Sequence, residues 1–73
     1  MRITALKEIV QAQPFRPFVT HVGGRNIEVT HPEQVLFAAD QSTVVIASAD
    51  GHIHLIDVHH IDGIERRGRR KAA

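Results

Sequence analysis

The chain has 73 residues and no cysteine, so we expect one small domain without disulfides or thiolate metal ligands. Its apolar runs are much shorter than the roughly 20 residues of a membrane-spanning helix, and we expect no membrane partner. Lys7 and Glu8 interrupt the apolar pattern near the N-terminus, which argues against a signal peptide. With the lack of cysteine, this favours a cytoplasmic location.

The formal net charge of +1 conceals an uneven distribution along the chain. Residues 1–65 carry four cations against all eight acids, a net charge of −4. The next segment adds five cations, at Arg66, Arg67, Arg69, Arg70 and Lys71. We expect residues 1–65 to form the folded domain and residues 66–73 to form a disordered basic tail. Such a tail suits an anionic partner, and the alternative is a solvated terminus that only keeps the protein soluble.

The first expected element is a helix at about residues 4–12. Its apolar side chains recur at helical spacing, at Ile3, Leu6, Ile9 and Val10. Thr4 is a suitable N-cap, and Pro14 stops the helix. Because three helical turns are not stable alone in water, we expect the apolar stripe to pack on a sheet.

Six short strands are expected after the helix, at residues 18–22, 26–30, 35–39, 43–48, 52–57 and 61–65. Gly23-Gly24 and Asp50-Gly51 predict tight turns, and residues 58–60 a single-turn break. On the second strand, Ile27 and Val29 should face the core. The three phenylalanines are the expected large core residues, at Phe15, Phe18 and Phe37.

Short antiparallel strands must hide two sheet edges, and a bent sheet closed into a small barrel hides both. The chain is therefore predicted to be mainly β, a five- to six-stranded antiparallel barrel with one N-terminal helix. The last hairpin, with its break at residues 58–60, resembles that of SH3-like and Sm-like small barrels. Sm-like proteins build rings by pairing strand edges, so the resemblance implies a homo-oligomer.

Four short motifs resemble a group of short uncharacterised bacterial proteins found in planctomycetes and some proteobacteria. The motifs are PFRPF at 14–18, GR at 24–25, VTHP at 29–32 and IHLID at 53–57. The likeness spans about residues 14–65. Gly23 stands where that group often has Asp, and Ile53 where it commonly has Phe. The group has no known activity, so the resemblance implies kinship and no function.

Histidines are concentrated in residues 52–60. His52 and His54 share one face of a strand, where neighbouring imidazoles could bind Zn²⁺. His31 could supply a third ligand from another part of the chain, and Asp57 or His59 a further one. The alternative is that His52 and His54 are half-exposed residues on the solvent face of the strand, opposite Ile53 and Leu55. Zinc is the only cofactor that the sequence suggests.

The chain has no nucleophile motif and no phosphate-binding glycine loop, so we expect a binding module and no enzyme. The leading hypothesis is non-specific nucleic-acid binding, RNA included, through the basic tail with help from Arg16 and Arg25. Without Trp or Tyr, the chain lacks the stacking platforms of single-strand binders. The alternatives are a protein–protein or self-assembly module, and a histidine-based metal binder.

Overall fold

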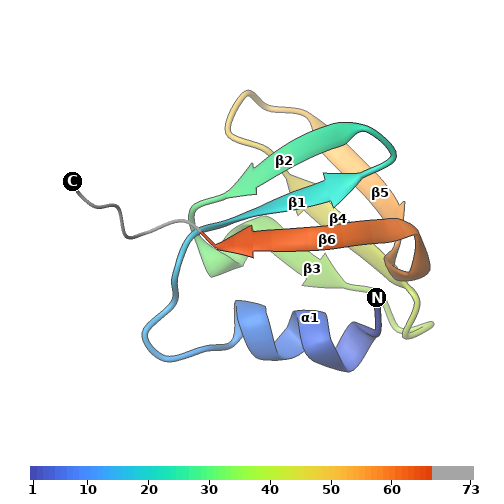
Figure 1. Cartoon of the computed structure of the whole chain (residues 1–73), viewed down its shortest axis with the longest axis horizontal. Helices are drawn as coiled ribbons and strands as arrows, with labels where there is room; N and C mark the ends of the chain where they lie inside the picture. The colour runs from blue at the N-terminus through green and yellow to red at the C-terminus, as the bar shows by residue number, and fades with distance from the viewer. Residues whose placement is uncertain (67–73) are drawn as a thin grey trace.

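The computed structural model describes residues 1–66, which form one helix and two three-stranded antiparallel sheets. Figure 1 shows the sheet β2-β1-β6 in front of the sheet β3-β4-β5, with the helix below both. The elements are α1 (Ile3–Val10), β1 (Phe18–Val22), β2 (Arg25–Val29), η1 (Pro32–Gln34), β3 (Val35–Phe37), β4 (Thr43–Ala47), β5 (Ile53–Asp57), η2 (Val58–His60) and β6 (Ile61–Arg66).

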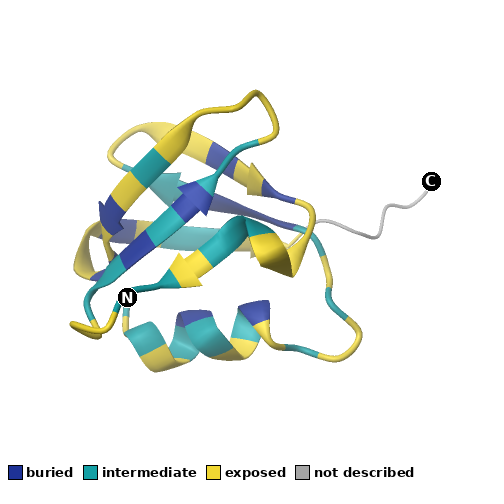
Figure 2. Cartoon of the chain, turned by 180° about the vertical axis from the view of Figure 1, so that it is seen from behind, coloured by how far each residue is buried: buried dark blue, intermediate teal, exposed yellow. Residues whose placement is uncertain are grey.

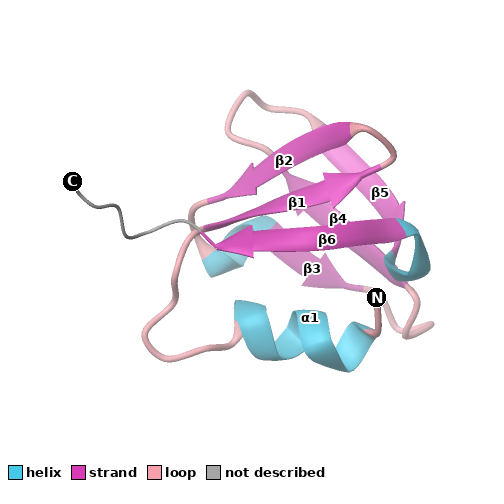
Figure 3. Ribbon diagram, in the orientation of Figure 1, coloured by secondary structure: helices cyan, strands magenta, loops and turns pink. Residues whose placement is uncertain are grey.

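The six predicted strands and the single-turn break at residues 58–60 are confirmed, while the predicted closed barrel is not confirmed. Within residues 1–66 no strand ladder joins the two sheets, whose strands are drawn in magenta in Figure 3. Here the chain breaks at η1 directly after β2, because Pro32 has no amide hydrogen to continue a ladder. The next strand, β3, has only three residues.

The helix is confirmed, but it begins and ends earlier than predicted. It spans Ile3–Val10, and its N-cap is Arg2, which makes no side-chain capping hydrogen bond. The predicted cap at Thr4 is therefore wrong, since Thr4 already lies inside the helix. The expected packing holds, because Leu6 and Val10 bury the helix's apolar stripe in the core.

One apolar core lies between the two sheets and α1. Its largest fully buried side chain is Phe18, which confirms one of the three predicted aromatic core residues. Phe15 and Phe37 are only partly buried and pack against the margin of the core. The buried members are Leu6, Val10, Phe18, Ile27, Val29, Val44, Ile46, Ile56, Val58 and Ile61. Ile27 and Val29 thus face inward, as the alternation along β2 predicts.

Gln34 holds the two sheets together at the point where the chain passes between them. Its Oε1 accepts hydrogen bonds from the backbone N–H groups of Thr30 at 2.8 Å and His31 at 2.9 Å. Its Nε2 donates to the carbonyl oxygen of Ala47 in β4, also at 2.8 Å. A single side chain therefore joins the end of the first sheet to the middle strand of the second.

Candidate functional site

The side of sheet β3-β4-β5 that faces away from the core is apolar and exposed. Leu36, Ile53 and Leu55 are 66%, 67% and 76% exposed. The strand register places Leu36 and Leu55 on either side of Val45, and Ile53 opposite Ala47. We name these five residues the outer apolar face. Figure 2 views the domain from behind; along β4 half-buried positions alternate with buried ones, and along β5 exposed positions alternate with less exposed ones.

The alternative to a zinc site places His52 and His54 on the solvent face of β5, opposite Ile53 and Leu55. His52 is exposed, but Ile53 and Leu55 also point to solvent and His54 is half-buried, so this orientation of the strand is wrong. The register explains this, because His54 lies opposite the buried Ile46. Apolar residues occur at both odd and even positions of β5, so alternation alone does not fix which face is inside.

β5 is an edge of its sheet, since the strand order is β3-β4-β5 and no other strand of residues 1–66 pairs with its outer side. A groove of about 410 Å³ runs between β5 and the β1–β2 hairpin. Arg25 and Ile27 line one wall, and Leu55 and Asp57 belong to the other. The edge of β5 is therefore reachable from outside the domain.

The described basic candidates lie at two opposite ends of the sheet β2-β1-β6. Arg66 is the last residue of β6 and pairs with Phe18 at the start of β1, two residues after Arg16. Arg25 pairs with Val22 at the other end of β1, about 13 Å away at the usual rise of a strand. All three arginines are exposed. Arg16 and Arg66 therefore share an end of the sheet, and Arg25 does not join them.

The basic tail lies almost entirely outside the described residues. Arg67, Arg69, Arg70 and Lys71 fall there, and only Arg66 is part of the fold, as the end of β6. The last strand thus runs one residue past the predicted boundary at 65.

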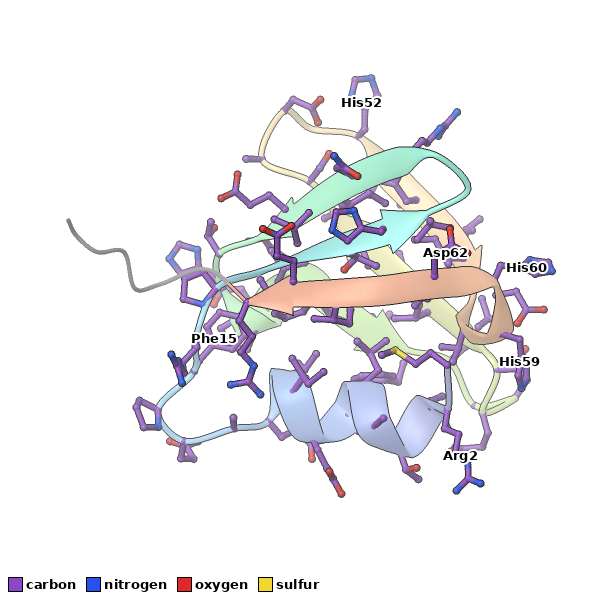
Figure 4. The ribbon with its side chains drawn as sticks, in the orientation of Figure 1. Arg2, Phe15, His52, His59, His60 and Asp62 are labelled. Atoms are coloured by element: carbon purple, nitrogen blue, oxygen red, sulfur yellow. The ribbon has the colours of Figure 1, made fainter. Side chains whose placement is uncertain are left out.

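The candidate zinc ligands are not gathered into one site. The imidazole centroids of His52 and His54 are 6.4 Å apart, and His52 Nδ1 lies 2.9 Å from the Asp50 carboxylate. His31 sits at the N-cap of η1. Figure 4 shows His52 projecting from the turn before β5, away from His59 and His60 at the far end of that strand. Within residues 1–66 no three His, Asp or Glu side chains form a group able to hold a metal ion, and zinc binding stays an untested prediction.

Three carboxylates cap turns of the chain. Backbone N–H groups of Ser42 and Thr43 donate to Asp40, and the Ser42 bond is the main reason why the pKa of Asp40 falls from 3.8 to about 2. The Ser48 hydroxyl donates to Asp50 and holds its pKa well below the usual range. The His59 N–H likewise lowers the pKa of Asp57. These acids stabilise turns, which accounts for them without a catalytic role.

The sequence signal for the outer apolar face is the IHLI segment at 53–56, with Ile56 on one face of the strand and Ile53 and Leu55 on the other. This pattern predicts a cover on both faces, the core on one and the helix or a neighbouring subunit on the other. Comparison of the chain with models of known families, with curated proteins and with solved structures finds no match, so the resemblance to the bacterial PFRPF group stays a prediction. In the part of the chain that the structure describes, no helix is long and apolar enough to cross a membrane.

Proposed function

We propose that this chain is a non-enzymatic interaction module whose copies associate through the outer apolar face. The observation that carries the proposal is the row formed by Leu36, Val45 and Leu55, whose two leucines are mostly exposed. Single exposed apolar residues are ordinary on protein surfaces, whereas a contiguous group of them marks a site of association.

A second copy of the chain suits this face because the face is complementary to itself. The outward side chains of the three strands include one charged group, Asp57, which lies opposite Thr43 at one end. Two copies can therefore join these faces, side by side or stacked, across a two-fold axis without opposing like charges at the centre. A domain of this size buries a modest share of its surface by folding alone, so association adds a useful amount of apolar burial.

The test is the molar mass of the full chain in solution, measured by light scattering after size-exclusion chromatography over a range of loading concentrations. The proposal expects a mass that rises towards a dimer or a larger oligomer, and a marked loss of association in Ile53→Ser, which removes an exposed apolar side chain at the β5 edge of the outer apolar face. Glu28→Ser is the matched control, an exposed strand position on the other sheet, and should associate like the wild type. A monomeric mass at every concentration would contradict the proposal.

A second candidate function is non-specific binding of nucleic acid through the chain end. Two exposed arginines, Arg16 and Arg66, lie at the end of the sheet from which the basic tail continues. Together with the tail they would place six cations in one region. Cations that neutralise phosphates release counterions, and the binding constant then falls steeply with salt.

Fluorescence anisotropy with a labelled single-stranded RNA tests this candidate. The full chain is compared with a variant in which Arg67, Arg69, Arg70 and Lys71 are all serine. Removing four phosphate contacts should lower the slope of log K against log salt by about 3 for a single strand. Arg25→Ser is the control cation at the opposite end of the sheet and should leave that slope nearly unchanged. Equal binding by the fourfold variant would rule out the tail as the contact.

A further inference from the structure

We infer that two copies of the chain pair antiparallel through the free edge of β5, so that two β3-β4-β5 sheets become one six-stranded sheet. This inference rests on the proposed self-association and places the contact at the β5 edge of the outer apolar face, where Ile53 and Leu55 meet those of the second copy and Leu36 stays outside the contact. It arises from the direction of the backbone groups, the side chains at the four sheet edges and the open space beside β5.

The backbone of β5 presents its unused hydrogen-bonding groups at odd-numbered residues. The Ser48 N–H donates to the carbonyl oxygen of His52, and the Val58 N–H donates to that of Ser42. The backbone groups of even-numbered residues in this stretch therefore point towards β4. Because the direction alternates along an antiparallel strand, the N–H and C=O groups of Ile53, Leu55 and Asp57 point to the outer edge.

β5 is also the least protected of the four sheet edges. Proteins usually protect edges with charged residues, prolines or very short strands. β2 carries Arg25 and Glu28, β6 carries Asp62 and Glu65, and β3 has only three residues. β5 has one charged residue, Asp57 at its end, and no proline, while its outward residues Ile53 and Leu55 are apolar.

Side-chain matching selects the register of the pairing. With His54 on the two-fold axis, Ile53 of one copy lies opposite Leu55 of the other, and Asp57 lies opposite Gly51. Shifting the axis to Leu55 would instead place Asp57 opposite Ile53, an acid against an apolar side chain. The first register also extends the outer apolar face from Leu55 of one copy to Ile53 of the next, without a polar interruption.

The space beside β5 is a groove of about 410 Å³ that is open to the outside. A paired strand lies about 4.8 Å from its neighbour. The groove between β5 and the β1–β2 hairpin opens on that side, with Arg25 and Ile27 on its far wall. The second copy's β5 would therefore enter this groove, and the first copy's β5 would enter the equivalent groove of its partner.

Single-cysteine variants test the pairing, because the natural chain contains no cysteine. His54 on the axis would face its own copy in a non-hydrogen-bonded pair, with Cα atoms about 4.5 Å apart, which a disulfide can bridge. Full-length His54→Cys should therefore form a disulfide-linked dimer under mild oxidation at least tenfold faster than Leu36→Cys. Leu36 belongs to the same face but lies two strands away from the β5 edge.

Leu55→Cys reports on the alternative register, and rapid cross-linking there with slow cross-linking at His54→Cys would overturn the register proposed. Rapid cross-linking only at Leu36→Cys would mean that the faces stack, which overturns edge pairing but leaves the proposed function standing. Sedimentation of each reduced variant checks that it folds and associates like the wild type. If every variant and the wild type are monomers without cross-links, the proposed function itself fails.

As a second test, Leu55→Pro removes an outward N–H that the pairing needs and none that β4 uses. The substitution should abolish dimer formation while the variant still unfolds cooperatively. Leu55→Thr keeps this N–H and is the matched comparison, expected to retain measurable association. Equal association of the two variants would contradict pairing through the edge.

Discussion

Val44 and Ile56 lie opposite each other in the β4–β5 ladder and are 0% and 7% exposed, whereas Leu55, the neighbour of Ile56, is the most exposed large apolar residue of the described chain. Two adjacent residues of β5 therefore have different roles. Ile56 contributes to the folding core, and Leu55 offers its side chain to solvent or to a partner.

This contrast predicts opposite consequences for two neighbouring substitutions. Ile56→Ala should lower the free energy of unfolding by about 2–5 kcal/mol, because it leaves a cavity in the core. Leu55→Ser should change that free energy by less than about 0.5 kcal/mol in dilute solution, since its side chain is already in water. Urea unfolding at low protein concentration measures both values. A loss for Leu55→Ser as large as that for Ile56→Ala would show that the face is not exposed.

Substitution of Gln34 should lower the free energy of unfolding, although its side chain is not part of the apolar core. Gln34→Ala removes the acceptor for the Thr30 and His31 N–H groups and the donor to Ala47. Water can replace Gln34 at the exposed Thr30 and His31 N–H groups, whereas the bond to Ala47 is partly buried, so we expect a loss of about 1 kcal/mol, which the same urea experiment measures. The neighbouring exposed residue provides the control, as Glu33→Ala should be nearly neutral. Equal effects of the two substitutions would refute the role of Gln34 between the sheets.

Replacement of Thr20 by valine should stabilise the fold. Its hydroxyl is fully buried in β1 and makes no hydrogen bond among the described residues. Thr20→Val has nearly the same shape and removes a polar group that folding takes out of water. The free energy of unfolding should rise by about 1 kcal/mol. A decrease of that size in a thermal or urea melt would mean that the hydroxyl has a partner, such as a buried water molecule.

The carboxylate of Asp40, in the turn between β3 and β4, should make the stability of the fold depend on pH. Its pKa is about 2 in the fold, below the ordinary 3.8, because turn N–H groups favour the ionised carboxylate. Its stabilising effect should therefore be complete above pH 3.8 and disappear as the pH falls through about 2. Asp40→Asn should lower the melting temperature at pH 6 and approach the wild type near pH 2.

The matched control for this pH dependence is Glu33→Gln, which removes an exposed carboxylate without touching that turn. Its difference from the wild type should stay small over the same pH range. A carboxyl titration of Asp40 followed by NMR, with a midpoint near 3.8 instead of about 2, would show that the turn does not hold the ionised form.

The local elements could be predicted from the sequence because each has its own signal. Gly23-Gly24 and Asp50-Gly51 mark turns, and positive φ angles at Gly23, Gly24 and Gly51 confirm why glycine is needed there. The arrangement of the strands could not be predicted in the same way. Whether six strands close into a barrel depends on long-range pairing, and here Pro32 and the short β3 leave two separate sheets.

Which side of β5 faces outward could not be predicted because β5 is apolar on both sides. Only the pairing of Ile56 with Val44 decides that the even-numbered residues face the core. The basic residues, in contrast, are evident in the sequence, but their arrangement in space is not. Their abundance is plain in the sequence, yet the fold places Arg25 at the far end of the sheet from Arg16 and Arg66.

The most direct test of the central claim is an amide NMR spectrum of the full chain recorded over a wide range of protein concentrations. Self-association at the β5 edge of the outer apolar face predicts that the resonances of Ile53 and Leu55 shift or broaden as the concentration rises. Resonances on the other sheet, such as those of Asn26 and Glu28, should stay in place. Spectra that do not change with concentration, or changes confined to the sheet β2-β1-β6, would contradict the account.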